Sequence, residues 1–221
     1  MEIRVYGPGQ EPAPFAVTMR TPGNDFELAV GLCCAEGLLT SAADVETIVY
    51  CRAADATSPG AKPEQQYNIV TVRLRRPVPE DLRARRYLAT SACGICGKAA
   101  LDEVEGRCAP VGAGPRVAAS VVRALPELLG GHQRVFDQTG GLHAAARFTV
   151  AGELLAARED VGRHNALDKL IGHALLEGVL PLESEVLLVS GRLSFELVQK
   201  AAVAGIPVLC DPADLVGKQQ Y

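Results

Sequence analysis

Two cysteines separated by two residues stand near the middle of the chain, in the run Ser-Ala-Cys-Gly-Ile-Cys-Gly-Lys at residues 91–98, and a helical pattern follows them. A cysteine at the start of a helix faces unpaired backbone N–H groups and the positive end of the helix dipole, which favour the thiolate. Lys98 acts in the same direction. A thiolate can bind a metal, attack a disulfide or carry sulfane sulfur as a persulfide. The residues between Cys93 and Cys96 do not decide among these.

The surroundings of the pair narrow the choice. A structural zinc site needs four ligands, usually from two close pairs, and here Cys108 with Cys51 or a histidine would have to complete the set. We therefore expect no zinc. A thioredoxin-like exchanger would place the pair at the first strand-to-helix junction of a βαβ unit, whereas this pair lies between two predicted domains. A glycine-rich loop there suits a thiol that takes a group at one site and delivers it at another.

Composition excludes several classes of function. The net charge of -4 over 221 residues provides no field that attracts nucleic acid, and no apolar run approaches the roughly 18 residues that a membrane span needs. Residues 1–6 lack the features of a signal peptide, so we expect a cytoplasmic protein whose seven cysteines are mostly reduced. Cys33 and Cys34 fall within a helical apolar pattern and are interpreted as small core residues.

A second concentration of polar residues occurs at 158–169, where a strand-like run crosses into a helical one. Asp160 can cap the helix, and Arg163, His164 and Asn165 fall in its first turn, from which they can project towards a ligand. Helix N-termini at strand ends bind anions through free N–H groups. We therefore interpret this crossing, including Gly162, as part of a ligand site.

A similar crossing follows the buried strand that residues 185–189 predict. Gly191 permits close approach of a ligand, and Arg192 can hold a phosphate or carboxylate through two hydrogen bonds. A serine cap at Ser190 next to a solvated arginine would explain the same three residues, so both interpretations remain open.

Paired glycines precede a further predicted strand, where they allow close backbone approach or a positive φ. His143 follows them, and its role stays open between ligand binding and structure. His132 and His173 have no such setting and are interpreted as structural. The candidate ligand-binding residues are Gly140, Gly141, His143, Asp160, Gly162, Arg163, His164, Asn165, Ser190, Gly191 and Arg192.

The order of predicted elements indicates an α/β protein in two parts. Residues 1–110 predict a small α+β domain that ends in the cysteine loop, and residues 111–221 predict a layered α/β domain with a mixed sheet and helices on both faces. Helices are expected at 25–37, 118–129, 162–177 and 193–204. Strands are expected at 3–6, 15–19, 45–51, 67–74, 141–150, 153–158, 185–189 and 207–210.

Five segments that occur together and in order resemble the formate dehydrogenase accessory sulfurtransferase (FdhD) family: residues 21–25, 93–97, 139–145, 159–169 and 190–192. The resemblance spans nearly the whole chain. It implies that the second domain is cytidine-deaminase-like and lacks catalytic zinc, and the helix starts here show neither a His-x-Glu nor a Pro-Cys-x-x-Cys run. It also implies that a C-terminal helix and strand usual in the family are missing, since the chain stops at Tyr221.

The resemblance further implies an activity. Sulfur would pass from a cysteine desulfurase to bis(molybdopterin guanine dinucleotide), the molybdenum cofactor of formate dehydrogenase, with Cys93 as the persulfide carrier and Cys96 as its assisting neighbour. A homodimer is possible by resemblance. The main alternative is a chaperone that holds the cofactor without covalent sulfur chemistry. Zinc-supported deamination is a third hypothesis, and it would require bound metal.

Overall fold

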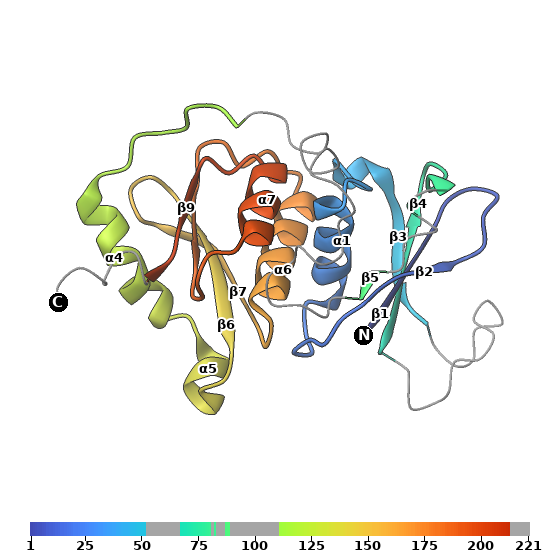
Figure 1. Cartoon of the computed structure of the whole chain (residues 1–221), viewed down its shortest axis with the longest axis horizontal. Coiled ribbons are helices and arrows are strands. Elements are labelled where there is room, and N and C mark those ends of the chain that lie inside the picture. Colours follow the sequence, from blue (N-terminus) through green and yellow to red (C-terminus); the bar gives the residue numbers. More distant parts are fainter. Residues whose placement is uncertain (52–66, 81, 83–86, 89–110, 213–221) are drawn as a thin grey trace.

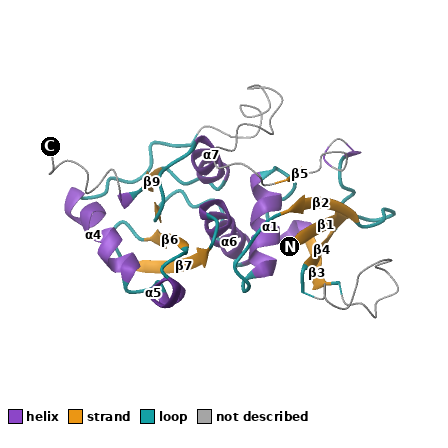
Figure 2. Cartoon of the chain, turned by 60° about the horizontal axis from the view of Figure 1, so that its bottom comes forward, coloured by secondary structure: helices purple, strands orange, loops and turns teal. Residues whose placement is uncertain are grey.

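The computed structural model of the chain describes residues 1–51, 67–80, 82, 87–88 and 111–212 (Figure 1). Cys93 and Cys96 lie outside these residues. The described chain forms two mixed sheets with helices between and around them, so the expectation of an α/β protein is confirmed. Figure 2 shows the two sheets at opposite sides of a central pair of helices.

The first sheet has the strand order β3-β4-β1-β2-β5. β1 pairs with β2 in antiparallel and with β4 in parallel orientation, and β5 pairs in parallel with the end of β2. Its elements are β1 (Glu2–Tyr6), β2 (Ala13–Val17), β3 (Val45–Tyr50), β4 (Ile69–Leu74) and β5 (Tyr87–Leu88), with the helix α1 (Asp25–Ala35) and the 3-10 turn η1 (Ala42–Asp44) between β2 and β3.

The second sheet has the order β7-β6-β8-β9, in which β6 is antiparallel to both of its neighbours and β8 is parallel to β9. Its strands are β6 (His143–Phe148), β7 (Leu154–Asp160), β8 (Val186–Val189) and β9 (Val208–Cys210). The accompanying helices are α4 (Ala119–Gly130), α5 (Arg134–Thr139), α6 (Arg163–Leu176) and α7 (Phe195–Val203).

Alternate residues of the second sheet pack against helices on opposite faces, as the two-residue period of a strand requires. Ala146 and Leu188 pack in one cluster with Leu125 and Leu129 of α4. Ala145, Leu187 and Val189 join a larger cluster that also contains buried residues of α6, α7 and the first sheet. Helices therefore cover both faces of this sheet. The cytidine-deaminase-like layering stays a prediction, as does the division into two domains near residue 110.

The helices α1 and α6 lie side by side between the two sheets (Figures 1 and 2). A glycine on each helix makes the contact possible, because a Cβ at Gly31 would lie 1.8 Å from the carbonyl oxygen of Asp168, and a Cβ at Gly172 would lie 1.9 Å from that of Glu27. No residue other than glycine fits at either position. The two backbones thus touch directly, and we call this contact the glycine contact.

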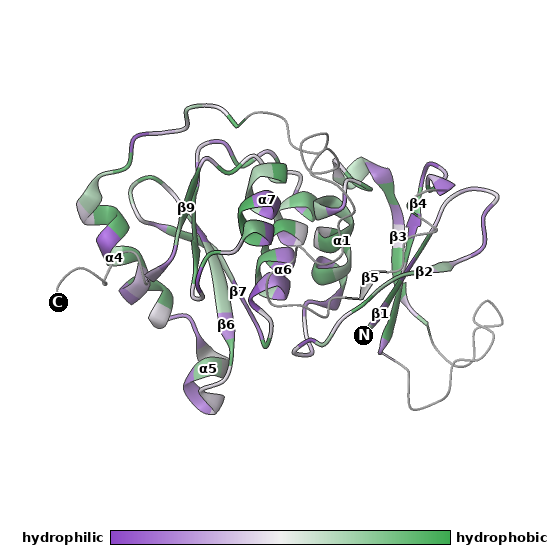
Figure 3. Cartoon of the chain, in the orientation of Figure 1, coloured by the Kyte–Doolittle hydropathy of each residue, from purple (hydrophilic) through white to green (hydrophobic). Residues whose placement is uncertain are grey.

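Burial on all sides explains the composition of α1. Every residue from Leu28 to Ala35 is buried, between the first sheet on one side and α6 on the other. A helix enclosed in this way is apolar around its whole circumference, and Figure 3 shows α1 as hydrophobic over most of its length. Cys33 and Cys34 are 0% and 3% exposed, which confirms their interpretation as core residues.

Candidate functional site

Three of the segments singled out in the sequence meet at one edge of the second sheet. Because β6 runs antiparallel to β7 and β8, its first residues lie beside their last ones: His143 pairs with Asp160, and Ala145 pairs with Val189. The start of α6 follows β7, and the loop to α7 follows β8. We call the group formed by His143, Arg163, His164, Ser190 and Gly191 the strand-end site.

Ser190 and Gly191 extend the pairing between β6 and β8 and then make room for two side chains. Ser190 Oγ accepts a hydrogen bond from the backbone N–H of Ala144 at 2.8 Å, so this hydroxyl is a part of the sheet edge. A Cβ at Gly191 would lie 3.2 Å from both Arg163 Cδ and His143 Nδ1. A glycine therefore lets the guanidinium stem and the imidazole lie directly against the backbone.

Burial determines the charge of this edge. It lowers the pKa of His143, and the neighbouring Arg163 guanidinium lowers it further. Burial also lowers the pKa of His164, whereas the carboxylate of Glu196 opposes that shift. Both imidazoles are therefore mostly neutral near pH 7. Positive charge comes from Arg163, from the N-terminus of the 14-residue helix α6 and from Arg192, which is exposed beyond Gly191. An anion is the ligand that this arrangement favours.

A neighbouring group of polar residues is enclosed, and we call it the brace: Asp160, Asn165, Lys169, Thr18 and Thr21. Asp160 is 0% exposed. One carboxylate oxygen accepts from the backbone of Thr21 at 3.0 Å and from Lys169 Nζ at 2.7 Å, and the other accepts from Gly162 N and Asn165 Nδ2, both at 3.0 Å. Both carboxylate oxygens of Asp160 thus accept their hydrogen bonds from groups within the protein.

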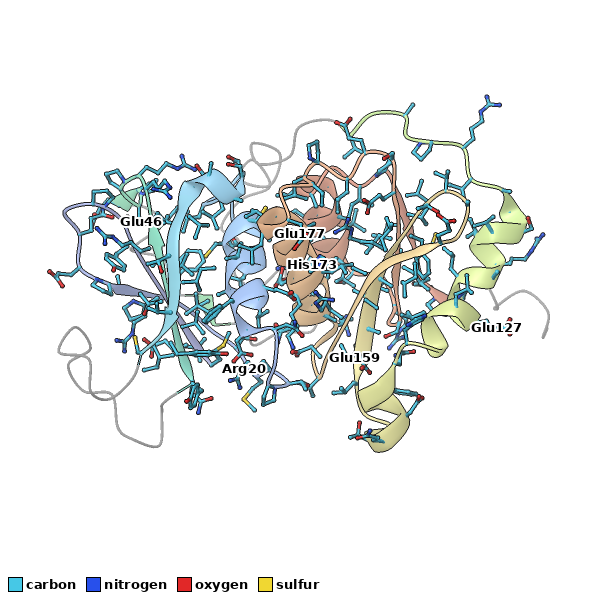
Figure 4. All side chains as sticks on the ribbon, turned by 180° about the vertical axis from the view of Figure 1, so that it is seen from behind. Arg20, Glu46, Glu127, Glu159, His173 and Glu177 are labelled. Atoms are coloured by element: carbon cyan, nitrogen blue, oxygen red, sulfur yellow. The ribbon has the colours of Figure 1, made fainter. Side chains whose placement is uncertain are left out.

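The other members of the brace bind the loop between β2 and α1. Asn165 donates to the carbonyl of Met19 at 2.6 Å and accepts from Thr18 Oγ1 at 3.1 Å. Lys169 donates to the carbonyls of Thr21 at 2.9 Å and Glu159 at 3.2 Å. Arg20 of this loop and Glu159 of β7 both lie along the lower side of the molecule in Figure 4. The brace therefore connects the first sheet to the start of α6.

The predicted ligand-binding residues thus divide among the strand-end site, the brace and positions outside both. Asp160 and Asn165 belong to the brace, and Gly162 is the N-cap residue of α6, where no side chain caps the helix. Gly140 ends α5 with a φ of 66°, and Gly141 leads into β6; both are exposed. His173, which was interpreted as structural, lies near the other end of α6 (Figure 4). Cys93 and Cys96 are outside the described residues.

Sequence reasoning did not select Lys169, Ser194 or Glu196 as site residues. Lys169 stands in the quoted run 159–169 and faces the brace, one helical turn after Asn165. Ser194 and Glu196 begin α7, and both lie beside His164. The sequence does contain a signal for Glu196, because this residue falls in the first turn of a helix that follows a strand end. An acidic residue at such a position is usually explained by the helix dipole alone.

The described part of the chain lacks two kinds of feature. It contains no group of three or more His, Cys, Asp or Glu residues that could hold a metal ion. Within the same residues, no helix has the length and apolar character that crossing a membrane would require.

Comparison with known proteins gives consistent results. The model of the FdhD/NarQ family matches residues 3–212. A protein of Streptomyces coelicolor named sulfur carrier protein FdhD is 51% identical over 214 residues, which are 95% of this chain and 72% of that protein. The protein of the same name from Sulfurisphaera tokodaii is 43% identical over 196 residues, covering 89% of this chain and 69% of that protein.

A solved structure shares the fold. The crystal structure of a candidate formate dehydrogenase accessory protein from Desulfotalea psychrophila superimposes with a TM-score of 0.63 at 20% identity, and the match covers 96% of this chain and 72% of that one. At that identity the likeness concerns the fold alone. With the family model matched over nearly the whole length and relatives about half identical, the chain belongs to the FdhD/NarQ family.

Proposed function

We propose that this protein is a sulfurtransferase that accepts persulfide sulfur from a cysteine desulfurase on Cys93 and delivers it to bis(molybdopterin guanine dinucleotide), for use by formate dehydrogenase. The observation that carries the proposal is the identity of about half the residues with proteins named sulfur carrier protein. Cys93 and Cys96 provide the sulfur chemistry in the sequence.

The strand-end site supports the choice of acceptor. Bis(molybdopterin guanine dinucleotide) is an anionic molecule with several phosphates, and phosphates bind at helix N-termini and to arginine. Arg163, the start of α6 and Arg192 offer these groups at one edge of a sheet. Gly191 leaves the backbone accessible there. We assign this edge to the phosphates of the acceptor.

The position of β5 supports the choice of Cys93. Leu88 of β5 pairs with Val17, and Thr18, the next residue of that loop, contacts Asn165 of the brace. Cys93 follows Leu88 by five residues in the sequence and lies outside the described residues. Leu88, the last described residue before it, pairs with the strand that leads into the loop held by the brace.

The decisive experiment is intact-protein mass spectrometry after incubation with a cysteine desulfurase and cysteine. We expect a gain of about 32 Da that a reductant removes and that Cys93→Ser lacks. Cys34→Ser is the matched control, because burial raises the pKa of Cys34 to about 11 and this thiol should not react.

The two outcomes lead to different functions. A reversible adduct on Cys93 that is retained in Cys34→Ser supports a sulfur carrier. If neither the wild type nor the control gains mass, the covalent mechanism is wrong. A protein that then still binds the cofactor would be the non-covalent chaperone instead.

A further inference from the structure

His164 occupies a distinctive place in the strand-end site, because it contacts a carboxylate. Its Nε2 lies 3.1 Å from Ser194 Oγ and 3.5 Å from Glu196 Oε2, and its side chain is 18% exposed. A carboxylate only accepts hydrogen bonds, so the tautomer with a proton on Nε2 suits this pair. In that tautomer Nδ1 is the basic atom of the ring.

Behind Glu196, a row of charged groups continues into the interior. Glu196 Oε1 lies 3.6 Å from Lys200 Nζ, and Lys200 Nζ donates to both carboxylate oxygens of Asp168, at 2.8 and 2.9 Å. The side chains of Lys200 and Asp168 are 5% and 2% exposed. Lys200 thus lies between the carboxylates of Glu196 and Asp168.

We propose that His164 is a catalytic residue that moves protons during sulfur transfer to the molybdenum, and that Glu196 is the positioning residue that orients its ring and stabilises its protonated form. This assignment rests on the proposed function. On this assignment His164 does more than contact the cofactor. The assignment also explains why the charged groups of Glu196 and Lys200 form a row that begins at the strand-end site.

The stoichiometry of the transfer includes two protons that such a group can move. When sulfur replaces an oxo ligand, the S–S bond of the Cys93 persulfide breaks, its terminal sulfur is reduced and bonds to the molybdenum as sulfide, and the Cys93–Cys96 disulfide forms. The oxo ligand leaves as water, and the oxidation state of the metal does not change. Both protons of that water come from the persulfide and from the Cys96 thiol. They must therefore travel from sulfur to oxygen, and an imidazole can accept and release each one.

The charged groups around His164 determine how well it performs this task. Glu196 of α7 raises the pKa of His164, whereas Lys200 of α7, Arg163 of α6 and His143 of β6 lower it, and burial has the largest effect. Loss of the Glu196 carboxylate should therefore lower this pKa further. The neutral ring would remain, but it would be a weaker base.

The first test follows the titration of the histidine ring signals by NMR. Glu196→Gln should lower the pKa of His164 by about 0.5 to 1 unit and leave the exposed His132 unchanged. Glu183→Gln is the matched control on an exposed residue before β8, and it should change neither. Because this test needs no sulfur chemistry, it does not depend on the proposed function. An unchanged pKa of His164 in Glu196→Gln contradicts the pairing.

The second test separates loading from transfer. Protein loaded with sulfur is freed of desulfurase and mixed with the oxo form of the cofactor, and mass spectrometry follows loss of the adduct and formation of the disulfide. We expect His164→Asn to load normally and to transfer about a hundredfold more slowly. In Glu196→Gln the acid limb of the transfer rate should move to lower pH together with the pKa of His164.

Each failure has its own meaning. If the wild type does not load, the proposed function is wrong whatever the NMR result. If loading is normal and His164→Asn transfers within about twofold of the wild type, the proton-transfer role of His164 is overturned and the sulfur-carrier function stands.

Discussion

The start of α6 belongs to two neighbouring groups of polar side chains that differ in what completes them. In the brace, the protein itself supplies the partners: both oxygens of Asp160 accept hydrogen bonds, and Lys169 donates to two carbonyls besides. In the strand-end site, the side chains of His143, Arg163 and His164 are half-buried and border solvent. Neighbouring residues of one sequence run thus divide into those that hold the chain together and those that border solvent, where we propose that the ligand binds.

Removing the carboxylate of Asp160 should cause the largest loss of stability. In Asp160→Ala, Lys169 stays buried at 1% exposure without its counter-ion, and breaking a buried pair in this way costs about 3–5 kcal/mol. Chemical denaturation would measure the free energy of unfolding. His143→Ala in the strand-end site is the matched comparison and should cost much less, because its ring is not enclosed. Equal losses in the two variants would remove the distinction between the groups.

A methyl group at the glycine contact should have the next largest effect. In Gly31→Ala the new Cβ would lie 1.8 Å from the carbonyl oxygen of Asp168, so α1 and α6 must move apart, at a cost of about 2–3 kcal/mol. Gly130→Ala is the control, because nothing lies within 4 Å of its Cβ position at the end of α4. That variant should be neutral or slightly stabilising. Thermal unfolding of both would show whether the contact is as tight as the distances indicate.

The smallest expected effect is the pH dependence of stability that comes from Asp168, the innermost residue of the charged row. Burial raises the pKa of Asp168 from its ordinary value of 3.8 to about 6, and Lys200 offsets only a part of that shift. The folded state therefore binds this proton more tightly than the unfolded state, so the contribution of Asp168 to stability rises as the pH falls from about 7 to about 4. Unfolding measured across this range should show that slope in the wild type and a weaker one in Asp168→Asn. An identical pH dependence in both would contradict the raised pKa.

Apolar stretches of the sequence predicted the longer buried elements. The spans expected at 25–37, 162–177 and 185–189 correspond to α1, α6 and β8. Three short elements were not expected, namely η1, β5 and α5. The strand β5 has two residues, and α5 has six, so neither is long enough to establish a period.

The meeting of three segments at one sheet edge was partly predictable, because strand ends and helix starts converge in α/β sheets. The brace was not. Thr18 and Asn165 are 147 positions apart in the sequence, and nothing in residues 18–21 beyond a turn signal indicates that they contact α6. Asp160 and Asn165 were predicted among the ligand-binding residues, and the structure shows their hydrogen bonds within the brace. Buried and ligand-facing polar residues look alike in a sequence. Only the partners of each atom tell them apart.

The glycine contact has a consequence for exchanging parts between relatives. Gly31 lies on the helix that covers the first sheet, and Gly172 lies on the helix that covers the second. Sliding one helix past the other by a turn, about 5.4 Å, would bring a residue with a side chain to the crossing point. The two glycines therefore fix the axial position at which α1 and α6 can pack, and with it the way in which the two sheets assemble. A chimaera that takes the segment with α1 from one homologue and the segment with α6 from another should fold only if both homologues have glycine at these two positions.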